Sequence, residues 1–185
     1  TTPAPQPEAE PEPARFTGKK HKVDRKWLRE QGLILPEGAV TGLLEEFRIV
    51  KRQLLVNAAD LRRQGSGAAA QRILVTSPHP NEGKSYCAVN LALSIAAEME
   101  SEVLLVDADV AKPSIPKMLG LPDGPGLIDA LTDPKRDPAD FVLGTDVPGL
   151  WVLPAGSSKS NADTEYLGSM RGGQVLDRLT QGAPH

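Results

Sequence analysis

The residues best suited to chemistry in this sequence are a glycine, a lysine and a serine in a row, Gly83, Lys84 and Ser85. A lysine ammonium neutralises phosphate oxygens, a serine hydroxyl ligates Mg²⁺, and glycine lets the backbone approach a phosphate closely. An apolar run at residues 73–75 and a short polar loop precede them, and an alanine-rich helical pattern follows. Strand, loop and helix in this order predict a phosphate-binding loop, because backbone N–H groups and the helix dipole point at one anion.

Two aspartates, Asp107 and Asp109, stand at the end of a second apolar run, residues 103–106. Residues i and i+2 of a strand share a face, so both carboxylates emerge together at its end. Ligands of open α/β sheets bind at that carboxyl edge. The spacing leaves room for one helix between the two runs, so the two acids are expected to face the phosphate loop.

Composition excludes several classes of function. The formal net charge of −3 argues against a nucleic-acid partner, so the phosphate ligand is expected to be a nucleotide. The single cysteine, Cys87, allows no internal disulfide and no cysteine metal site. No stretch approaches the ~18 apolar residues of a membrane span, and there is no signal-peptide pattern, which predicts a cytoplasmic protein.

The chain is predicted to divide into a tail and one domain. Residues 1–14 are rich in proline and glutamate and residues 15–29 are basic, so residues 1–32 are expected to form a disordered tail. Apolar runs with strand-like composition follow at residues 73–75, 103–106 and 150–153. Strands that alternate with helices predict an α/β fold for residues 33–185, a doubly wound parallel sheet with helices on both faces.

These motifs resemble those of one known family. Residues 77–85 resemble the variant Walker A loop of bacterial tyrosine kinases, and residues 103–109 resemble their Walker A′ motif, an apolar run ending in Asp-x-Asp. Glu45, Arg48 and Lys51 are similar to the family's E-x-x-R-x-x-R helix motif, with lysine at the last position. The likeness is strongest to the exosortase-associated tyrosine autokinases of exopolysaccharide gene clusters, and it implies the P-loop NTPase version of the α/β fold.

The resemblance implies an ATP-dependent protein-tyrosine autokinase that regulates exopolysaccharide synthesis or export. Lys84, Asp107 and Asp109 would be catalytic, and Ser85 and the two aspartates would hold Mg²⁺. Asp107 would orient or deprotonate the attacking tyrosine hydroxyl and Asp109 would assist the metal, and these two roles can be exchanged. The residues expected to bind ATP are Ser77, Pro80, Asn81, Glu82, Gly83, Lys84, Ser85 and Tyr86.

The resemblance also implies partners. Glu45, Arg48 and Lys51 would contact the nucleotide site of a neighbouring copy in a ring, in which the copies phosphorylate one another. The alternative is an ordinary ladder of salt bridges along the helix that starts near Thr41. A separate transmembrane protein that sets polysaccharide chain length is the implied external partner, and it would bring the chain to the inner membrane.

Departures from the family pattern keep other functions open. No apolar strand ending in Asp-x-Pro follows Gly156, so the Walker B acid is missing, and the only tyrosines are Tyr86 and Tyr166. The domain is therefore expected to be incomplete at the C-terminus and weakly active or inactive alone. One alternative is a switch ATPase of the partitioning type, although His79 stands where those proteins have a signature lysine. Another is a non-catalytic nucleotide-binding regulator of polysaccharide export.

Overall fold

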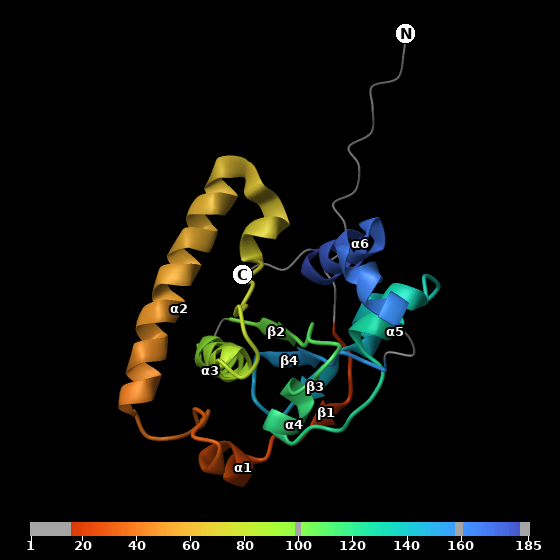
Figure 1. Cartoon of the computed structure of the whole chain (residues 1–185). Coiled ribbons are helices and arrows are strands. Elements are labelled where there is room, and N and C mark those ends of the chain that lie inside the picture. The colour runs from red at the N-terminus through yellow and green to blue at the C-terminus, as the bar shows by residue number, and fades with distance from the viewer. Residues whose placement is uncertain (1–15, 99–100, 158–160, 182–185) are drawn as a thin grey trace.

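The computed structural model describes residues 16–98, 101–157 and 161–181, and in that part of the chain one four-stranded sheet forms the centre (Figure 1). Its strands lie in the order β1-β3-β4-β2. Their bounds are β1 Lys20–His21, β2 Val103–Val106, β3 Leu143–Thr145 and β4 Leu150–Leu153. The predicted strands at 103–106 and 150–153 are thus confirmed, and they pair in parallel as β2 and β4.

The sheet is mixed, so the prediction of a wholly parallel sheet is wrong. β3 and β4 are antiparallel, whereas β1 pairs with β3 in parallel. The reason is the short connection between β3 and β4, which turns through Gly149 at φ +76°. A parallel pair needs a crossover of a dozen or more residues, and this connection leaves room only for a hairpin.

Side chains alternate between two apolar layers, one on each face of the sheet. Leu105 and Val152 pack into a core with α1 (Arg25–Glu30), α3 (Lys84–Ala96) and α4 (Ile115–Leu119). The neighbouring residues, Leu104 and Leu153, pack on the opposite face. That face is covered by α5 (Leu127–Thr132), the 3₁₀ turn η3 (Pro138–Phe141) and α6 (Met170–Thr180). Helices therefore cover both faces, as predicted, with α3 and α5 on opposite sides (Figure 1).

The basic segment after residue 15 belongs to the folded domain, which corrects the predicted tail of residues 1–32. Val23 and Leu28 are completely buried, and β1 and α1 lie in this segment. The Asp24 carboxylate caps α1 by accepting a hydrogen bond from the Trp27 amide at 2.9 Å. Scattered apolar residues of this segment enter the core while its lysines stay in solvent. The prediction of a disordered tail followed from the many basic residues and did not weigh these few apolar ones. Residues 1–15 lie outside the described part of the chain.

The predicted helix after Thr41 is confirmed as α2, Gly42–Leu61. The Thr41 hydroxyl caps it by accepting from the Leu44 amide at 3.2 Å. α2 packs along α3 and then continues beyond it before the chain turns back through η1 (Arg62–Ser66) and η2 (Gly67–Gln71) (Figure 1). The expected apolar face is only partly buried: Val50 is 48% exposed, and the one buried residue of the helix is Lys51.

The predicted strand at residues 73–75 is not formed. Within the described residues no strand pairs with it, and Leu74 is 85% exposed. An apolar run becomes a strand only when another strand pairs with it, and here that pairing is not made.

At the C-terminal end, η4 (Asn161–Gly168) precedes α6. The helical pattern predicts a break at residues 172–173, but α6 runs through them and the break falls at Ser169, whose hydroxyl caps α6. A Cβ on Gly172 would lie 2.4 Å from the Leu167 carbonyl oxygen, so this glycine permits the close approach of η4. Among the described residues no helix has both the length and the apolar character to cross a bilayer.

Candidate functional site

The predicted phosphate loop lies at the start of α3. Gly83 is the N-cap residue with φ +93°, and Asn81 also has a positive φ, +64°. A Cβ on Gly83 would meet no atom within 4 Å, so the backbone conformation, rather than lack of space, requires glycine here. No side chain caps α3, which leaves the amides of its first turn available for an anion.

Two internal hydrogen bonds shape the loop. The Ser77 hydroxyl donates to the His79 carbonyl at 2.9 Å, and the His79 amide donates to the Glu82 carboxylate at 3.1 Å. Residues 78–82 are exposed, so Pro80 and Asn81 are open to a ligand from solvent. The loop is thus preformed and accessible.

Lys84 and Asp109 meet as the sequence predicts. The Lys84 ammonium lies 2.9 Å from the Asp109 carboxylate, and both side chains are about one-third exposed or less. The hydrogen bond from Lys84 holds the pKa of the Asp109 carboxyl below its ordinary value, so this carboxyl is ionised at neutral pH. The contact brings the end of β2 to the start of α3, and a bound phosphate would compete with Asp109 for the ammonium.

Asp107 has a different environment, because it is only 4% exposed. One of its carboxylate oxygens accepts from the Asp109 amide at 3.1 Å, and the other accepts from the amides of Ser114 and Ile115 at 2.9 and 3.0 Å. The carboxylate therefore shapes the loop between β2 and α4. Its contact with Ser114 also links it to Ser85, because the two serine hydroxyls are hydrogen-bonded.

Ser114 is a polar residue of the site that the sequence interpretation missed. Its hydroxyl lies 3.1 Å from the Ser85 hydroxyl. A serine 29 positions beyond the loop in the chain carries no pattern of its own, and only the turn around Asp107 brings it there. The feature of the sequence that could have pointed to Ser114 as a site residue is its position five residues after the Asp-x-Asp motif.

The Tyr86 side chain is hydrogen-bonded to another part of the fold. Its hydroxyl donates to the Gly32 carbonyl at 2.7 Å, so the side chain ties α3 to the turn after α1. The geometry supports a structural role for Tyr86 and gives no contact to the phosphate loop.

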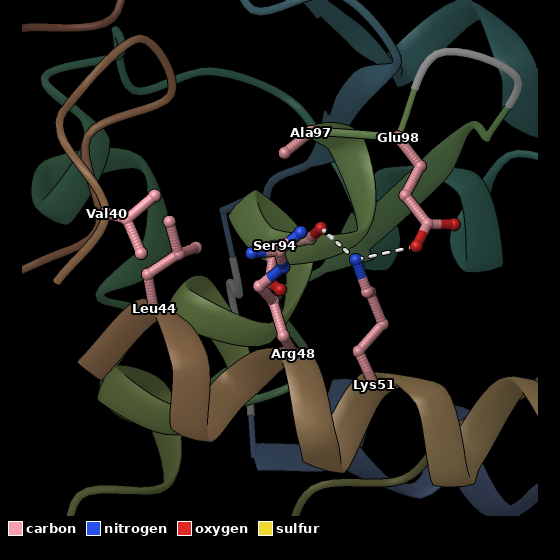
Figure 2. A pocket seen from close by; sticks show the side chains of 7 residues that line it. All are labelled: Val40, Leu44, Arg48, Lys51, Ser94, Ala97 and Glu98. Atoms are coloured by element: carbon pink, nitrogen blue, oxygen red, sulfur yellow. Dashed lines mark hydrogen bonds and ion pairs between the residues drawn. The ribbon is translucent and has the colours of Figure 1, made fainter. Parts of the chain in front are cut away.

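Glu45, Arg48 and Lys51 do not act as one surface. Figure 2 shows the Lys51 side chain reaching from α2 to α3, where its ammonium contacts the Ser94 carbonyl at 3.1 Å and the Glu98 carboxylate at 2.7 Å. Lys51 is 6% exposed and cannot face a neighbouring copy while this contact holds. Arg48 and Glu45 pair with each other at 2.7 Å and stay about half exposed. Arg48 also lines, together with Lys51, a pocket of about 250 Å³ between α2 and α3.

The oxygen donors fit a magnesium ion that arrives with a nucleotide. Within the described residues no cluster of three or more His, Cys, Asp or Glu side chains could hold a metal. Both oxygens of Asp107 and both of Asp109 are engaged, yet each carboxylate keeps at least one lone pair, so the Ser85 hydroxyl and the two carboxylates are the oxygen donors of the site. Mg²⁺ in nucleotide sites commonly has one or two protein ligands and completes its shell with phosphates and water. The donor set therefore suits Mg-nucleotide and does not suit a free ion.

Comparisons with known proteins agree with this site. Residues 68–140 match the ParA family, described as NUBPL iron-transfer P-loop NTPase. The chain is 32% identical over 120 residues to the tyrosine-protein kinase ptk of Acinetobacter johnsonii, which covers 65% of this chain and 16% of that protein. It is 34% identical over 114 residues to the tyrosine-protein kinase CpsD of Streptococcus agalactiae, which covers 60% and 48%. The chain thus spans less than half the length of these curated relatives.

A solved structure extends the likeness to the fold. The crystal structure of the chimerical protein CapA2B2 superposes with a TM-score of 0.59 at 25% identity, and the match covers 89% of this chain and 65% of that one. The P-loop NTPase-like α/β fold is therefore confirmed, as is the resemblance of the sequence to bacterial tyrosine kinases.

Proposed function

We propose that this chain binds ATP with Mg²⁺ at the loop before α3 and transfers the γ-phosphoryl group to a tyrosine hydroxyl. The observation that carries the proposal is the 2.9 Å contact of Lys84 with Asp109, beside Ser85 at the start of α3. The names of the relatives, which include a succinoglycan biosynthesis transport protein, support a role in exopolysaccharide production. Such a protein would act on the cytoplasmic side, where ATP is available.

Phosphoryl transfer of this kind depends on positioning and charge neutralisation. The Lys84 ammonium exchanges its contact with Asp109 for the phosphate oxygens, and the amides of the loop hold the remaining charge. Asp109, released from Lys84, would be free to orient the attacking tyrosine hydroxyl or to assist the metal. Mg²⁺, when bound, supplies further neutralisation of the β and γ phosphates. Asp107 keeps the loop in place through its three amide contacts.

A ring of copies is part of the proposal. Its interface would use two of the three motif residues that the sequence predicts. Glu45 and Arg48 remain exposed on α2 and are available to a neighbouring nucleotide site, whereas Lys51 is engaged with α3. A transmembrane partner that sets polysaccharide chain length is proposed on the same grounds as before, the likeness to exopolysaccharide kinases.

A second candidate function is nucleotide binding without tyrosine phosphorylation, as in a switch ATPase or a regulator of export. The match of residues 68–140 to an iron-transfer P-loop NTPase description favours it, because this part contains both the loop and the two aspartates. Within the described residues β2 pairs only with β4, so its other edge, beside the site, is uncovered, and this favours the second candidate as well. We propose that this chain by itself transfers phosphate weakly. Against the switch ATPases, the loop has an exposed histidine, His79, at the position of their signature lysine.

Calorimetric titration tests the proposal first at the level of binding. Mg-ADP should bind the wild-type chain, and Lys84→Met should weaken binding by at least tenfold, since a charge-assisted contact to phosphate contributes about 1.5–3 kcal/mol. Lys135→Met, at an exposed lysine in a loop, is the matched control and should bind as the wild type. Equal affinity of the Lys84 variant and the wild type would exclude the phosphate-loop assignment.

Radiolabelled ATP then separates the two functions. Transfer of label to tyrosine in the protein or in an added tyrosine polymer supports the kinase. Binding of Mg-ADP with release of phosphate to water alone, or with no turnover, supports the second candidate.

A further inference from the structure

We infer that Ser114 is a positioning residue for the cation-binding hydroxyl of Ser85. The inference rests on the proposed function and adds to it a residue on the loop between β2 and α4. The two hydroxyl oxygens lie 3.1 Å apart, although 29 positions separate the serines in the chain. Ser114 is partly buried, so little solvent competes for this contact.

The Ser114 hydroxyl is not used where a serine at its position normally is. Ser114 is the N-cap residue of α4, and N-cap serines usually accept a hydrogen bond from the amide of the second or third helical residue. No such bond forms here. Pro116 is the second helical residue and has no amide hydrogen to give, which removes one of the two usual donors. The hydroxyl is therefore available for Ser85.

The backbone of Ser114 is held rigidly at the same time. Its amide and that of Ile115 donate to one Asp107 oxygen at 2.9 and 3.0 Å, and Asp107 is only 4% exposed. Asp107 is itself fixed to the sheet, because its amide donates to the Leu153 carbonyl at 2.9 Å. A continuous series of hydrogen bonds thus runs from β4 through Asp107 and Ser114 to Ser85 at the start of α3.

The direction of the hydroxyl hydrogen explains what this contact does. A serine hydroxyl has one hydrogen and two lone pairs. In the structure the Ser114 hydroxyl donates to the Ser85 oxygen and so occupies one of its two lone pairs. The second lone pair of Ser85 is then left for a cation, and the Ser114 contact fixes the direction in which it points. Ser114 therefore orients the Ser85 oxygen for cation binding.

The test is titration of the whole chain with ADP, once with Mg²⁺ and once with EDTA. Ser114→Ala should weaken Mg-ADP binding by roughly 3- to 10-fold, the range expected for loss of one hydrogen bond, and leave metal-free ADP binding unchanged. Ser114→Thr keeps the hydroxyl and should restore Mg-ADP binding. Ser101→Ala removes a surface hydroxyl that lies 3.5 Å from Glu98, away from the site, and is the matched control.

A double variant separates positioning from a general structural effect. Once Ser85 is alanine, Ser114→Ala should cause no further loss of Mg-ADP affinity, because it acts only through Ser85. If Ser114→Ala fails to fold, Ser114→Cys keeps the volume with a weaker donor and should show the same selective loss.

Three outcomes would overturn the inference. Unchanged Mg-ADP binding by Ser114→Ala would reject it and leave the proposed function standing. Equal weakening with and without Mg²⁺ would assign Ser114 to the loop structure alone. If the wild-type chain bound ADP under neither condition, the proposed function would fail and this inference with it.

Discussion

Asp107 and Asp109 stand two positions apart, yet the backbone around them gives the two carboxylates different tasks. Asp107 is buried and accepts three amide hydrogen bonds, and these fix the turn that carries Ser114. Asp109 is partly exposed and contacts the Lys84 ammonium. From the sequence, both acids are expected at the end of β2, but their roles remain exchangeable. Strand geometry predicts only that the two side chains emerge on the same face, whereas their different contacts come from the hydrogen bonds of the following loop.

The pKa of Asp109 leads to a prediction on acid stability. Because Lys84 holds this pKa below its ordinary value, the Lys84–Asp109 contact stabilises the fold fully above roughly pH 4. Its contribution should disappear as the pH falls through the lowered pKa. Asp109→Asn should therefore cost up to about 1 kcal/mol of unfolding free energy from about pH 6 to 8, and progressively less below about pH 4.

Urea unfolding at several pH values measures this difference. Asp140→Asn, at an exposed aspartate of η3, serves as the control and should show little cost at any pH. A cost of Asp109→Asn that grew toward acid pH would contradict the assignment of the contact.

At the scale of elements, the sequence predicted what depends on local pattern. β2, β4, α2 and α3 appear where apolar runs and helical patterns place them, and Thr41 caps α2 as expected. The apolar run at residues 73–75 forms no strand, because a strand also needs a neighbour, which lies elsewhere in the chain. The burial of Lys51 likewise depends on where α3 packs, although its spacing with Glu45 and Arg48 resembles a motif.

Lys51 leads to a prediction on how α2 is held. Lys51→Met keeps the length of the side chain but removes both contacts to α3, and it leaves Glu98 without its cation. We expect a loss of about 1–3 kcal/mol in the free energy of unfolding by urea, the range for a buried polar contact. Arg48→Met, on the same helix, should cost less than about 0.5 kcal/mol, because its pair with Glu45 is half exposed. Equal costs of the two changes would place Lys51 on the surface with Arg48.

The Arg48→Met variant also tests the proposed ring of copies. If Arg48 contacts a neighbouring copy, light scattering should show a smaller species for Arg48→Met than for the wild type. An unchanged molar mass would reject the contact with a neighbouring copy. Arg48 and Glu45 would then form only a salt bridge within α2, which is the alternative interpretation of this motif.

At the scale of the whole molecule, the sheet has an open side next to the candidate site. β2 pairs with β4 on one edge, and in the described residues no strand covers its other edge. The amides of Val103 and Asp107 donate toward β4, so the amides of Leu104 and Val106, which alternate with them, face the open edge. Residues 73–75, with Leu74 85% exposed, pair with no strand of the described residues. We propose that the free edge of β2 accepts a further apolar strand.

Hydrogen exchange of the 185-residue chain tests this proposal amide by amide. Exchange of an amide in a strand is slow only while a carbonyl accepts its hydrogen, so Leu105, which faces β4, should be protected. Leu104 and Val106 should exchange at least about 100-fold faster, and the amides of residues 73–75 should be as fast, because none has a strand partner. An open edge is also a template for pairing with another strand, so protection of Leu104 and Val106 should rise with protein concentration. Slow exchange of these two amides in dilute solution would show that the edge is already covered, and the proposed further strand would then have no place to bind.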